Sequence, residues 1–178
     1  GSTDRTGLVA SQYGATVIRH PANAGYGRSL KDGILRSRYD VIGITDADGT
    51  YPVCELPRLV KMAEIFDMVV GARSGPAYRG SVIKFAARWL FRFLVEFATG
   101  RAIPDINSGL RVFRKDVVVR FLEIASDRFS FTTTITLALL LNGYFVHYVP
   151  IAYSPRIGVS KVNHYRDTLR AAQGIVQA

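Results

Sequence analysis

Two aspartates one residue apart, Asp46 and Asp48, directly follow the apolar run "DVIGIT" at residues 40–45. A short continuous apolar run is typical of a strand that is covered on both faces. Side chains at positions i and i+2 of an extended chain point to one side, so both carboxylates should converge while Ala47 turns away. Such carboxylates suit Mg²⁺ or Mn²⁺, with a diphosphate supplying further ligands. The alternative is a solvated turn, since Asp and Gly are common turn residues.

Two further segments place basic or polar residues at the end or the start of an expected strand. Arg73 ends the run "DMVVGAR" at residues 67–73, and its forked guanidinium suits a phosphate group. An ordinary surface arginine at a strand end is the alternative. The segment "DINSGLRVFRK" at residues 105–115 gathers polar side chains around a glycine before another expected strand, and these are Asp105, Asn107, Ser108 and Arg111. A polar loop capped by its own side chains would look the same.

A long helix is expected over residues 80–98, within "SVIKFAARWLFRFLVEFATG". Its polar residues recur every four positions and so form one narrow stripe, made of Lys84, Arg88, Arg92 and Glu96. The remaining apolar arc is much wider than the roughly 100° that packing on a core requires. A membrane interface or a second copy of the chain would cover the excess, and a central buried helix is the alternative.

The elements that must position these residues alternate between strands and helices. Strands are expected at 15–20, 40–45, 67–73, 110–114 and 144–153, and helices at 5–13, 24–37, 53–65, 80–98, 115–124, 131–141 and from about 164. This alternation predicts an α/β fold with a mostly parallel sheet flanked by helices, in a single domain over residues 1–178. Ligands of such sheets bind outside the carboxyl ends of the strands, where Asp46 and Asp48 are expected.

The overall composition favours an anionic partner. The 178 residues carry a formal net charge of +9 and are 48% hydrophobic, enough for one globular core. Nucleic acid, phosphorylated metabolites and acidic lipid surfaces all fit that charge. The single cysteine, Cys54, excludes an internal disulfide framework and a thiolate metal site, which is compatible with a reducing compartment.

Six segments in order resemble the family 2 glycosyltransferases, in the branch of dolichol-phosphate mannosyltransferase and the bacterial polyprenyl-phosphate glycosyltransferases. They are "GSTDRTG", "HPANAGYGRSLKDGI", "DVIGITDADGTYP", "DMVVGAR", "DINSGLRVFRK" and "RIGVSKVNHYRDTL". The resemblance implies a GT-A fold, a Rossmann-like α/β domain that binds a UDP- or GDP-linked sugar through Mg²⁺ or Mn²⁺. It also implies that Asp46 and Asp48 hold the metal and the diphosphate.

The resemblance assigns further roles to the residues named above. Asp105 becomes the candidate catalytic base or acceptor-orienting group. The donor loop would contain Asn23, Gly25 and Gly27. The acceptor phosphate would be held by Arg73, Lys84, Arg88, Ser108 and Arg111. A loop closing over the diphosphate would carry Arg156, Ser160 and Lys161.

Two departures from the family pattern matter. Relatives often carry a glutamine two positions after the second aspartate, where this chain has Thr50. Relatives also have a first strand and an acidic pair before the segment that matches "GSTD", so we expect the catalytic domain to be incomplete at its N-terminus. His20 and His147 are expected to be structural.

The sequence therefore predicts a metal-dependent inverting glycosyltransferase that moves a sugar onto a polyprenyl phosphate at the cytoplasmic face of the cell membrane, without a nucleic-acid partner. A family 2 enzyme with a saccharide acceptor is one alternative. A non-catalytic basic module that binds membrane or nucleic acid is the other.

Overall fold

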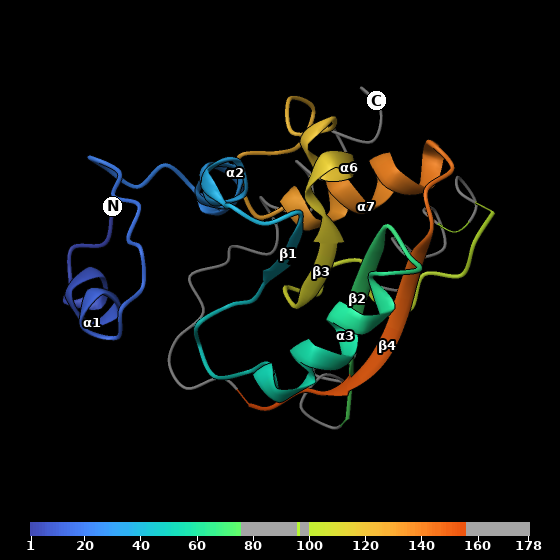
Figure 1. Cartoon of the computed structure of the whole chain (residues 1–178), viewed down its shortest axis with the longest axis horizontal. Coiled ribbons are helices and arrows are strands. Elements are labelled where there is room, and N and C mark those ends of the chain that lie inside the picture. Colours follow the sequence, from blue (N-terminus) through green and yellow to red (C-terminus); the bar gives the residue numbers. More distant parts are fainter. Residues whose placement is uncertain (76–95, 97–99, 156–178) are drawn as a thin grey trace, which may run out of the picture.

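The computed structural model describes residues 1–75, 96 and 100–155. Its centre is a four-stranded sheet in the order β1-β3-β2-β4 (Figure 1). The strands are β1 (Val41–Ile44), β2 (Met68–Ser74), β3 (Arg111–Arg114) and β4 (Val146–Ala152). β3 pairs antiparallel with β1 and with β2, whereas β2 and β4 pair in parallel. β1, β2 and β4 therefore share one direction, and β3 runs against them.

The strands expected at 40–45, 67–73, 110–114 and 144–153 are confirmed, and so is the α/β class. The antiparallel insertion of β3 was not predicted. The strand expected at 15–20 is wrong, because these residues adopt no regular structure. An extended segment becomes a strand only when a neighbour takes up its backbone hydrogen bonds. None of the strands in the described ranges pairs with this segment.

Five of the expected helices are confirmed, four of them with shorter bounds and the one at 131–141 with the bounds expected. They are α1 (Thr6–Gln12), α2 (Tyr26–Arg36), α3 (Leu56–Met62), α6 (Lys115–Val119) and α7 (Phe131–Leu141), with a 3₁₀ turn η1 (Val53–Glu55) before α3. α3 begins with a proline in its first turn, where a missing N–H costs nothing. α1 buries none of its residues and lies apart from the sheet in Figure 1.

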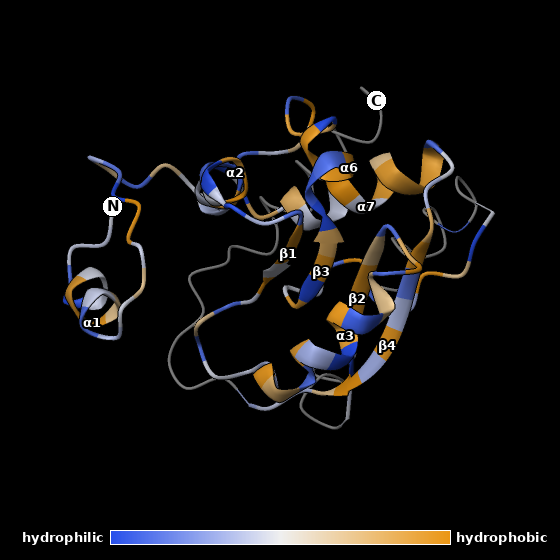
Figure 2. Ribbon diagram, in the orientation of Figure 1, coloured by the Kyte–Doolittle hydropathy of each residue, from blue (hydrophilic) through white to orange (hydrophobic). Residues whose placement is uncertain are grey.

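Alternating strand residues divide the core into two layers. Met68 and Val70 of β2 face a cluster that includes Ile34 of α2 and Phe131 of α7. Val69 faces the opposite layer, which is built on α3. The sheet is thus covered by α3 on one face and by α2, α6 and α7 on the other. Figure 2 shows that β2 between these layers is mainly hydrophobic, whereas β4 at the edge is mixed. Burial on both faces explains why β2 is a continuous apolar run.

Two glycines in α2 provide a matched test of this packing. A Cβ at Gly27 would collide with the backbone oxygen of Ser126, whereas one at Gly33 would meet open space. We expect Gly27→Ala to destabilise the protein by about 1–3 kcal/mol, because the backbone must move apart. Gly33→Ala should instead stabilise it by about 0.5–1 kcal/mol, since alanine favours helix. Urea denaturation measures both, and equal midpoints for the two variants would contradict the packing.

Candidate active site

The strand directions bring the candidate residues to one edge of the sheet. β1 ends at Ile44, immediately before the two aspartates, and β2 ends at Ser74, next to Arg73. Because β3 runs in the opposite direction, its first residue lies at this same edge, and Arg111 is paired with Ile44. The loop before β3 therefore lies beside the residues that follow β1. Mixed strand direction, rather than a purely parallel sheet, places residues 105–110 at the site.

Asp46 and Asp48 have the alternation expected for a shared site. Both are half-buried, and Ala47 between them is exposed. Oδ1 of Asp48 accepts hydrogen bonds from the Thr50 amide at 3.2 Å and from Thr50 Oγ1 at 2.6 Å. Thr50 itself is 1% exposed. At the position where relatives often have glutamine, Thr50 thus orients Asp48 within a tight turn.

The Asp46 carboxylate lies against the backbone of the loop before β3. A Cβ at Gly109 would be 2.6 Å from Asp46 Oδ2, so this close approach requires glycine. The Gly109 amide donates to Tyr51 Oη at 2.7 Å. Burial raises the pKa of Tyr26, and the charge of Asp46 and a hydrogen bond with its side chain raise it further. Tyr26 is therefore a neutral phenol beside Asp46.

Arg73 and Asp105 form a two-pronged ion pair at the edge. Arg73 Nε donates to Asp105 Oδ2 at 2.7 Å, and the Arg73 Nη2 donates to Oδ1 at 2.9 Å. The carboxylate also accepts from the amides of Arg73 and Asn107. The Asp105 side chain is 2% exposed, whereas that of Arg73 is 17% exposed. With both oxygens engaged, the contacts favour an orienting role for Asp105 over that of a base.

Ser108 and Arg111 were expected to hold the acceptor phosphate. In the structure, both side chains instead form hydrogen bonds inside the protein. Ser108 is fully buried, and its hydroxyl donates to the Gly71 carbonyl at 2.6 Å. Arg111 is 1% exposed, and its guanidinium donates to carbonyl and hydroxyl oxygens of the protein. A buried guanidinium that is already bound in this way has no path to an acceptor phosphate. We correct both assignments, since these side chains hold the edge together.

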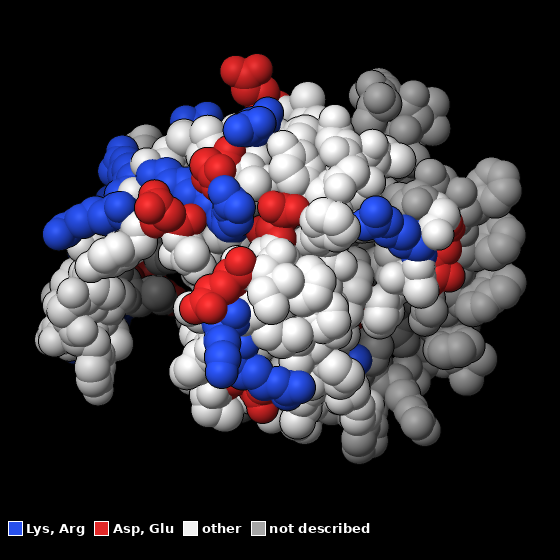
Figure 3. All heavy atoms as spheres, turned by 45° about the vertical axis from the view of Figure 1, so that its right-hand side comes forward, with Lys and Arg blue, Asp and Glu red and all other residues white. Residues whose placement is uncertain are grey.

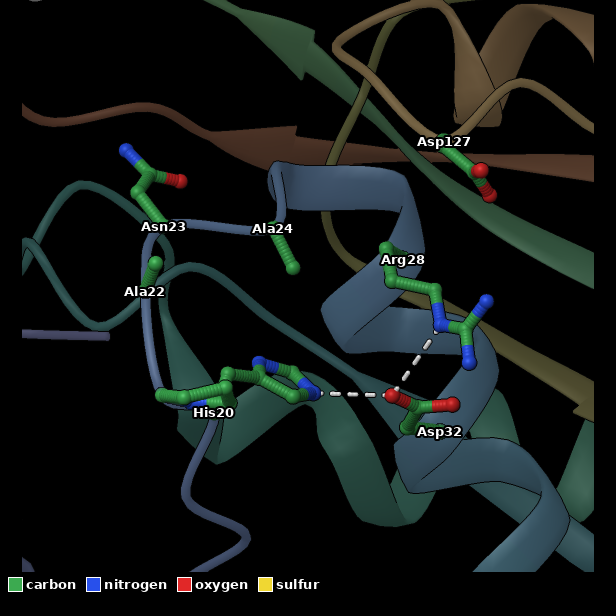
Figure 4. Close-up of a pocket in the computed structure, with 8 residues that line it drawn as sticks. His20, Ala22, Asn23, Ala24, Arg28, Asp32 and Asp127 are labelled. Carbon is green, nitrogen blue, oxygen red and sulfur yellow. Dashed lines mark hydrogen bonds and ion pairs between the residues drawn. The ribbon is translucent and has the colours of Figure 1, made fainter.

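The expected donor loop lies at the start of α2. The Asn23 side chain accepts from the Gly25 amide at 3.0 Å. Gly25 and Gly27 both approach the backbone of residues 126–128 closely, so these glycines serve packing of α2 in this structure. An open hollow of about 410 Å³ lies beside this loop (Figure 4), and its lining residues are His20, Pro21, Ala22, Asn23, Ala24, Arg28, Asp32 and Asp127.

In Figure 4, His20 from the segment before α2 and Arg28 of α2 converge on Asp32, which lies one turn after Arg28 on the same helix. His20 Nε2 lies 2.8 Å and Arg28 Nε 3.2 Å from Asp32 Oδ2. The other structural histidine, His147, stacks on Phe66 at 4.5 Å between ring centroids. Both histidines therefore have structural contacts, as expected from the sequence.

The contacts of Asp32 with His20 and Arg28 predict that the stability of the fold depends on pH. The hydrogen bond from His20, with support from Arg28, holds the pKa of Asp32 below its ordinary value. A lowered folded-state pKa stabilises the fold fully above the unfolded value near 3.9, and this contribution disappears as pH falls through the folded value. We expect Asp32→Asn to melt below the parent at pH 7 and the gap to close below pH 4. Thermal melts from pH 7 downwards test this, and a gap independent of pH would contradict it.

The donor set at the edge fits a magnesium-type ion bound jointly with substrate. In the part of the chain that the structure describes, no group of three or more His, Cys, Asp or Glu side chains is placed to hold a metal. Asp46 and Asp48 together supply carboxylate oxygens only. Mg²⁺ is commonly held by one or two carboxylates, with waters and substrate phosphates completing its shell. The two residues therefore fit an ion that arrives with a diphosphate.

Three tyrosines at this edge were not among the site residues expected from the sequence. Tyr26 lies beside Asp46, and Tyr51 Oη accepts a hydrogen bond from the Gly109 amide. The ring of Tyr153 lies under Arg73, with its centroid 5.5 Å from the guanidinium carbon. Tyr51 and Tyr153 also meet edge to face at 5.3 Å. Tyr51 lies in the same short stretch as the two aspartates, which was the available signal.

Several expected site residues lie outside the described residues. These are Lys84, Arg88, Arg156, Ser160 and Lys161, together with the expected helix at 80–98, of which Glu96 alone is described, and the expected helix from about 164. Among the helices that are described, none combines the length and apolar character needed to span a membrane.

A comparison with protein families assigns the chain to a class of enzymes. Residues 1–121 match the family model described as "Glycosyl transferase family 2". The chain belongs to this family, and its α/β fold is of the GT-A type.

Among curated proteins, the chain is similar to the low-salt glycan biosynthesis hexosyltransferase Agl6 of Haloferax volcanii, at 32% identity over 95% of this chain and 42% of that protein. It is 27% identical to the dolichyl-phosphate hexose transferase of the same organism, over 99% of this chain and 77% of the relative. The polyprenol monophosphomannose synthase of Mycolicibacterium smegmatis is 30% identical over 92% of this chain and 68% of its own length. The chain thus spans less than half of the first relative and about three quarters or less of the others.

Solved structures with the same fold include glucosyl-3-phosphoglycerate synthase of Mycobacterium tuberculosis. Its complex with Mg²⁺ and UDP superposes with a TM-score of 0.75 at 16% identity, covering 99% of this chain and 65% of that one. Its complex with Mn²⁺ and UDP-glucose gives a TM-score of 0.71 at 16% identity, over 99% and 64% of the two chains. At this identity the likeness establishes the fold alone.

Proposed function

We propose that this protein transfers a sugar from a nucleotide-sugar to a polyprenyl phosphate. The observation that carries the proposal is the meeting, at one sheet edge, of the Asp46–Asp48 pair with the Arg73–Asp105 ion pair. Carboxylates suit a metal-bound diphosphate, and a preformed guanidinium fork suits a second phosphate. Two relatives named for dolichyl phosphate and polyprenol support this acceptor class.

On the donor side, Asp46 and Asp48 would hold Mg²⁺ or Mn²⁺ with the diphosphate of a UDP- or GDP-linked sugar. A bound ion of this kind stabilises negative charge on a departing diphosphate. Thr50 keeps Asp48 oriented through its two hydrogen bonds, and Tyr26 offers a neutral donor to Asp46. Asn23, Gly25 and Gly27 remain the proposed donor loop, with Gly25 and Gly27 acting by fixing the start of α2.

On the acceptor side, Arg73 would hold the phosphate whose oxygen attacks the anomeric carbon, giving inversion. Asp105 fixes the guanidinium from behind through both of its oxygens. A phosphate monoester is already mostly ionised near pH 7, so its attack requires little help from a base. Lys84 and Arg88 on the expected 80–98 helix, and the expected loop with Arg156, Ser160 and Lys161, complete the proposed phosphate contacts.

We place the protein at the cytoplasmic face of the membrane as a peripheral enzyme, because its acceptor would be embedded there. The helix expected over residues 80–98, whose sequence is mostly apolar, is the proposed contact for lipid or for a second copy. The competing basic-module hypothesis receives less support. On the face in Figure 3, acidic side chains are interspersed among the basic ones, whereas nucleic-acid sites favour a continuous basic surface.

Calorimetric titration distinguishes these functions. We expect UDP or GDP to bind with Mn²⁺ present and far more weakly with a chelator. A nucleic-acid module would instead bind an oligonucleotide with steep salt dependence. Salt-sensitive oligonucleotide binding without metal-dependent nucleotide binding would overturn the proposed function. A saccharide acceptor, the other family 2 alternative, is distinguished by the product formed.

A further inference from the structure

Arg111 is a buried cation whose guanidinium donates to three backbone carbonyls, to one threonine hydroxyl and to the sulfur of Met68. Its Nε donates to the Ser108 carbonyl at 2.7 Å, and its Nη2 to the Ile106 carbonyl at 2.6 Å. Its Nη1 donates to the Thr132 carbonyl at 3.0 Å and to Thr136 Oγ1 at 2.6 Å. One guanidinium thus joins the loop before β3 to the first turns of α7. Burying a charge is costly unless such bonds satisfy it, so the arrangement requires a reason.

The loop that Arg111 holds carries the central contacts of the proposed site. Asp105 lies directly before Ile106 and clasps Arg73. Gly109 lies directly after Ser108, packs against the Asp46 carboxylate and donates to Tyr51. The two carbonyls bound by Arg111 therefore lie between the acceptor-side and donor-side contacts. A second tie from α7, Thr133 Oγ1 to Asn107 Oδ1 at 2.6 Å, fastens the middle of the same loop.

The buried charge of Arg111 interacts with the ionisable side chains around it. Burial lowers its pKa, and the nearby phenols Tyr148 and Tyr26 and the carboxylate Asp105 counteract that effect. Burial raises the pKa of Tyr148 to about 12, so this phenol stays neutral beside the guanidinium. A fixed positive charge under an edge that holds several carboxylates offsets their mutual repulsion. Lysine cannot reproduce the arrangement, because a single ammonium lacks the planar fork.

We propose that Arg111 is a positioning residue for sugar transfer. It holds residues 105–110 in the conformation in which Asp105 forms its ion pair with Arg73 and Gly109 lies against the Asp46 carboxylate. Arg111 acts from the interior and contacts neither substrate. The proposal rests on the proposed function for its catalytic consequence, but its structural claim, a locked loop, is independent of that function.

The test compares Arg111→Lys with Arg114→Lys on the same strand. Arg114 is exposed and pairs with Asp116 on the surface, so its variant is the matched control. We expect Arg111→Lys to lower kcat about 100-fold, the size of effect that a displacement of about 1 Å produces. Metal-dependent nucleotide affinity should change far less than kcat. Hydrogen exchange should accelerate at the amides of Asn107 and Gly109 while β2 and β4 stay protected.

Each outcome decides the proposal. Local exchange in residues 105–110 together with a loss in kcat supports it, with Arg114→Lys unchanged in both. Unchanged exchange in this loop overturns it, and so does an exchange increase spread over β2 and β4, which would make Arg111 a residue of global stability. Unaltered kcat in a folded variant with a loosened loop also overturns it. If the parent neither binds nucleotide with metal nor transfers sugar, the proposed function fails, and exchange alone then decides the locking claim.

Discussion

Replacing Asp48 by asparagine is expected to lower sugar transfer by at least about a thousandfold, because a metal clamp contributes several kcal/mol of charge stabilisation in the transition state. The substitution preserves the local structure. The asparagine side-chain oxygen can still accept from the amide and hydroxyl of Thr50, as Asp48 Oδ1 does at 3.2 and 2.6 Å. The change therefore removes the charge and a metal ligand while keeping the turn. Initial rates with saturating donor measure the effect.

The matched control for Asp48→Asn is Asp116→Asn, which removes a carboxylate from an exposed pair with Arg114. Exposed pairs contribute about 0–1 kcal/mol, so this control should keep its rate and its melting temperature. Equal rates for the Asp48 variant and the parent would show that the aspartate pair is a solvated turn. A lower melting temperature for Asp48→Asn, with an unchanged rate per folded molecule, would lead to the same conclusion.

Replacing Asp105 by asparagine is expected to reduce kcat/KM for the acceptor about 100-fold, because Arg73 loses its fixed geometry. An amide offers one acceptor oxygen where Asp105 now offers two, so an N–H of Arg73 would face an amide NH₂ group. Breaking a buried pair in this way also costs about 3–5 kcal/mol of stability. Acceptor kinetics and urea denaturation measure the two effects separately.

A double-mutant cycle with Arg73→Lys tests whether the two residues act as one unit. If Asp105 serves only to hold Arg73, the double variant should be little worse than either single variant. Losses that multiply would contradict the orienting role. Loss of the acidic limb of the pH–rate profile in Asp105→Asn alone would restore Asp105 as a general base.

Much of the fold was predictable because burial leaves local patterns. The apolar run before Asp46 and the run ending at Arg73 both became strands, with the alternation that puts Ala47 outside and the aspartates half inside. Three strand directions followed from the alternation of strands and helices. The direction of β3 did not, because a four-residue strand carries no signal of which neighbours it will join. The prediction of a strand at 15–20 was wrong for the same reason. Its residue pattern fits a strand, but a local pattern does not show whether a neighbouring strand pairs with it.

The candidate site was predictable in its charged residues and not in their contacts. Arg73 and Asp105 are far apart in sequence. The antiparallel pairing of β3 with β2 brings the loop that carries Asp105 beside the end of β2. Arg111 was expected to hold the acceptor phosphate, whereas arginine inside a protein is rare and was not anticipated. Its burial depends on carbonyls from the loop and from α7, which no local pattern reveals.

Transfer of labelled sugar to a polyprenyl phosphate shows whether the protein makes a lipid-linked sugar. The protein is incubated with UDP- and GDP-linked sugars, Mn²⁺ and polyprenyl phosphate in detergent, beside a soluble saccharide acceptor and the Asp48→Asn variant. We predict a labelled lipid that forms only with Mn²⁺ or Mg²⁺ and that the variant does not make. A labelled saccharide without labelled lipid, or lipid labelling that survives both chelation and Asp48→Asn, would contradict the account.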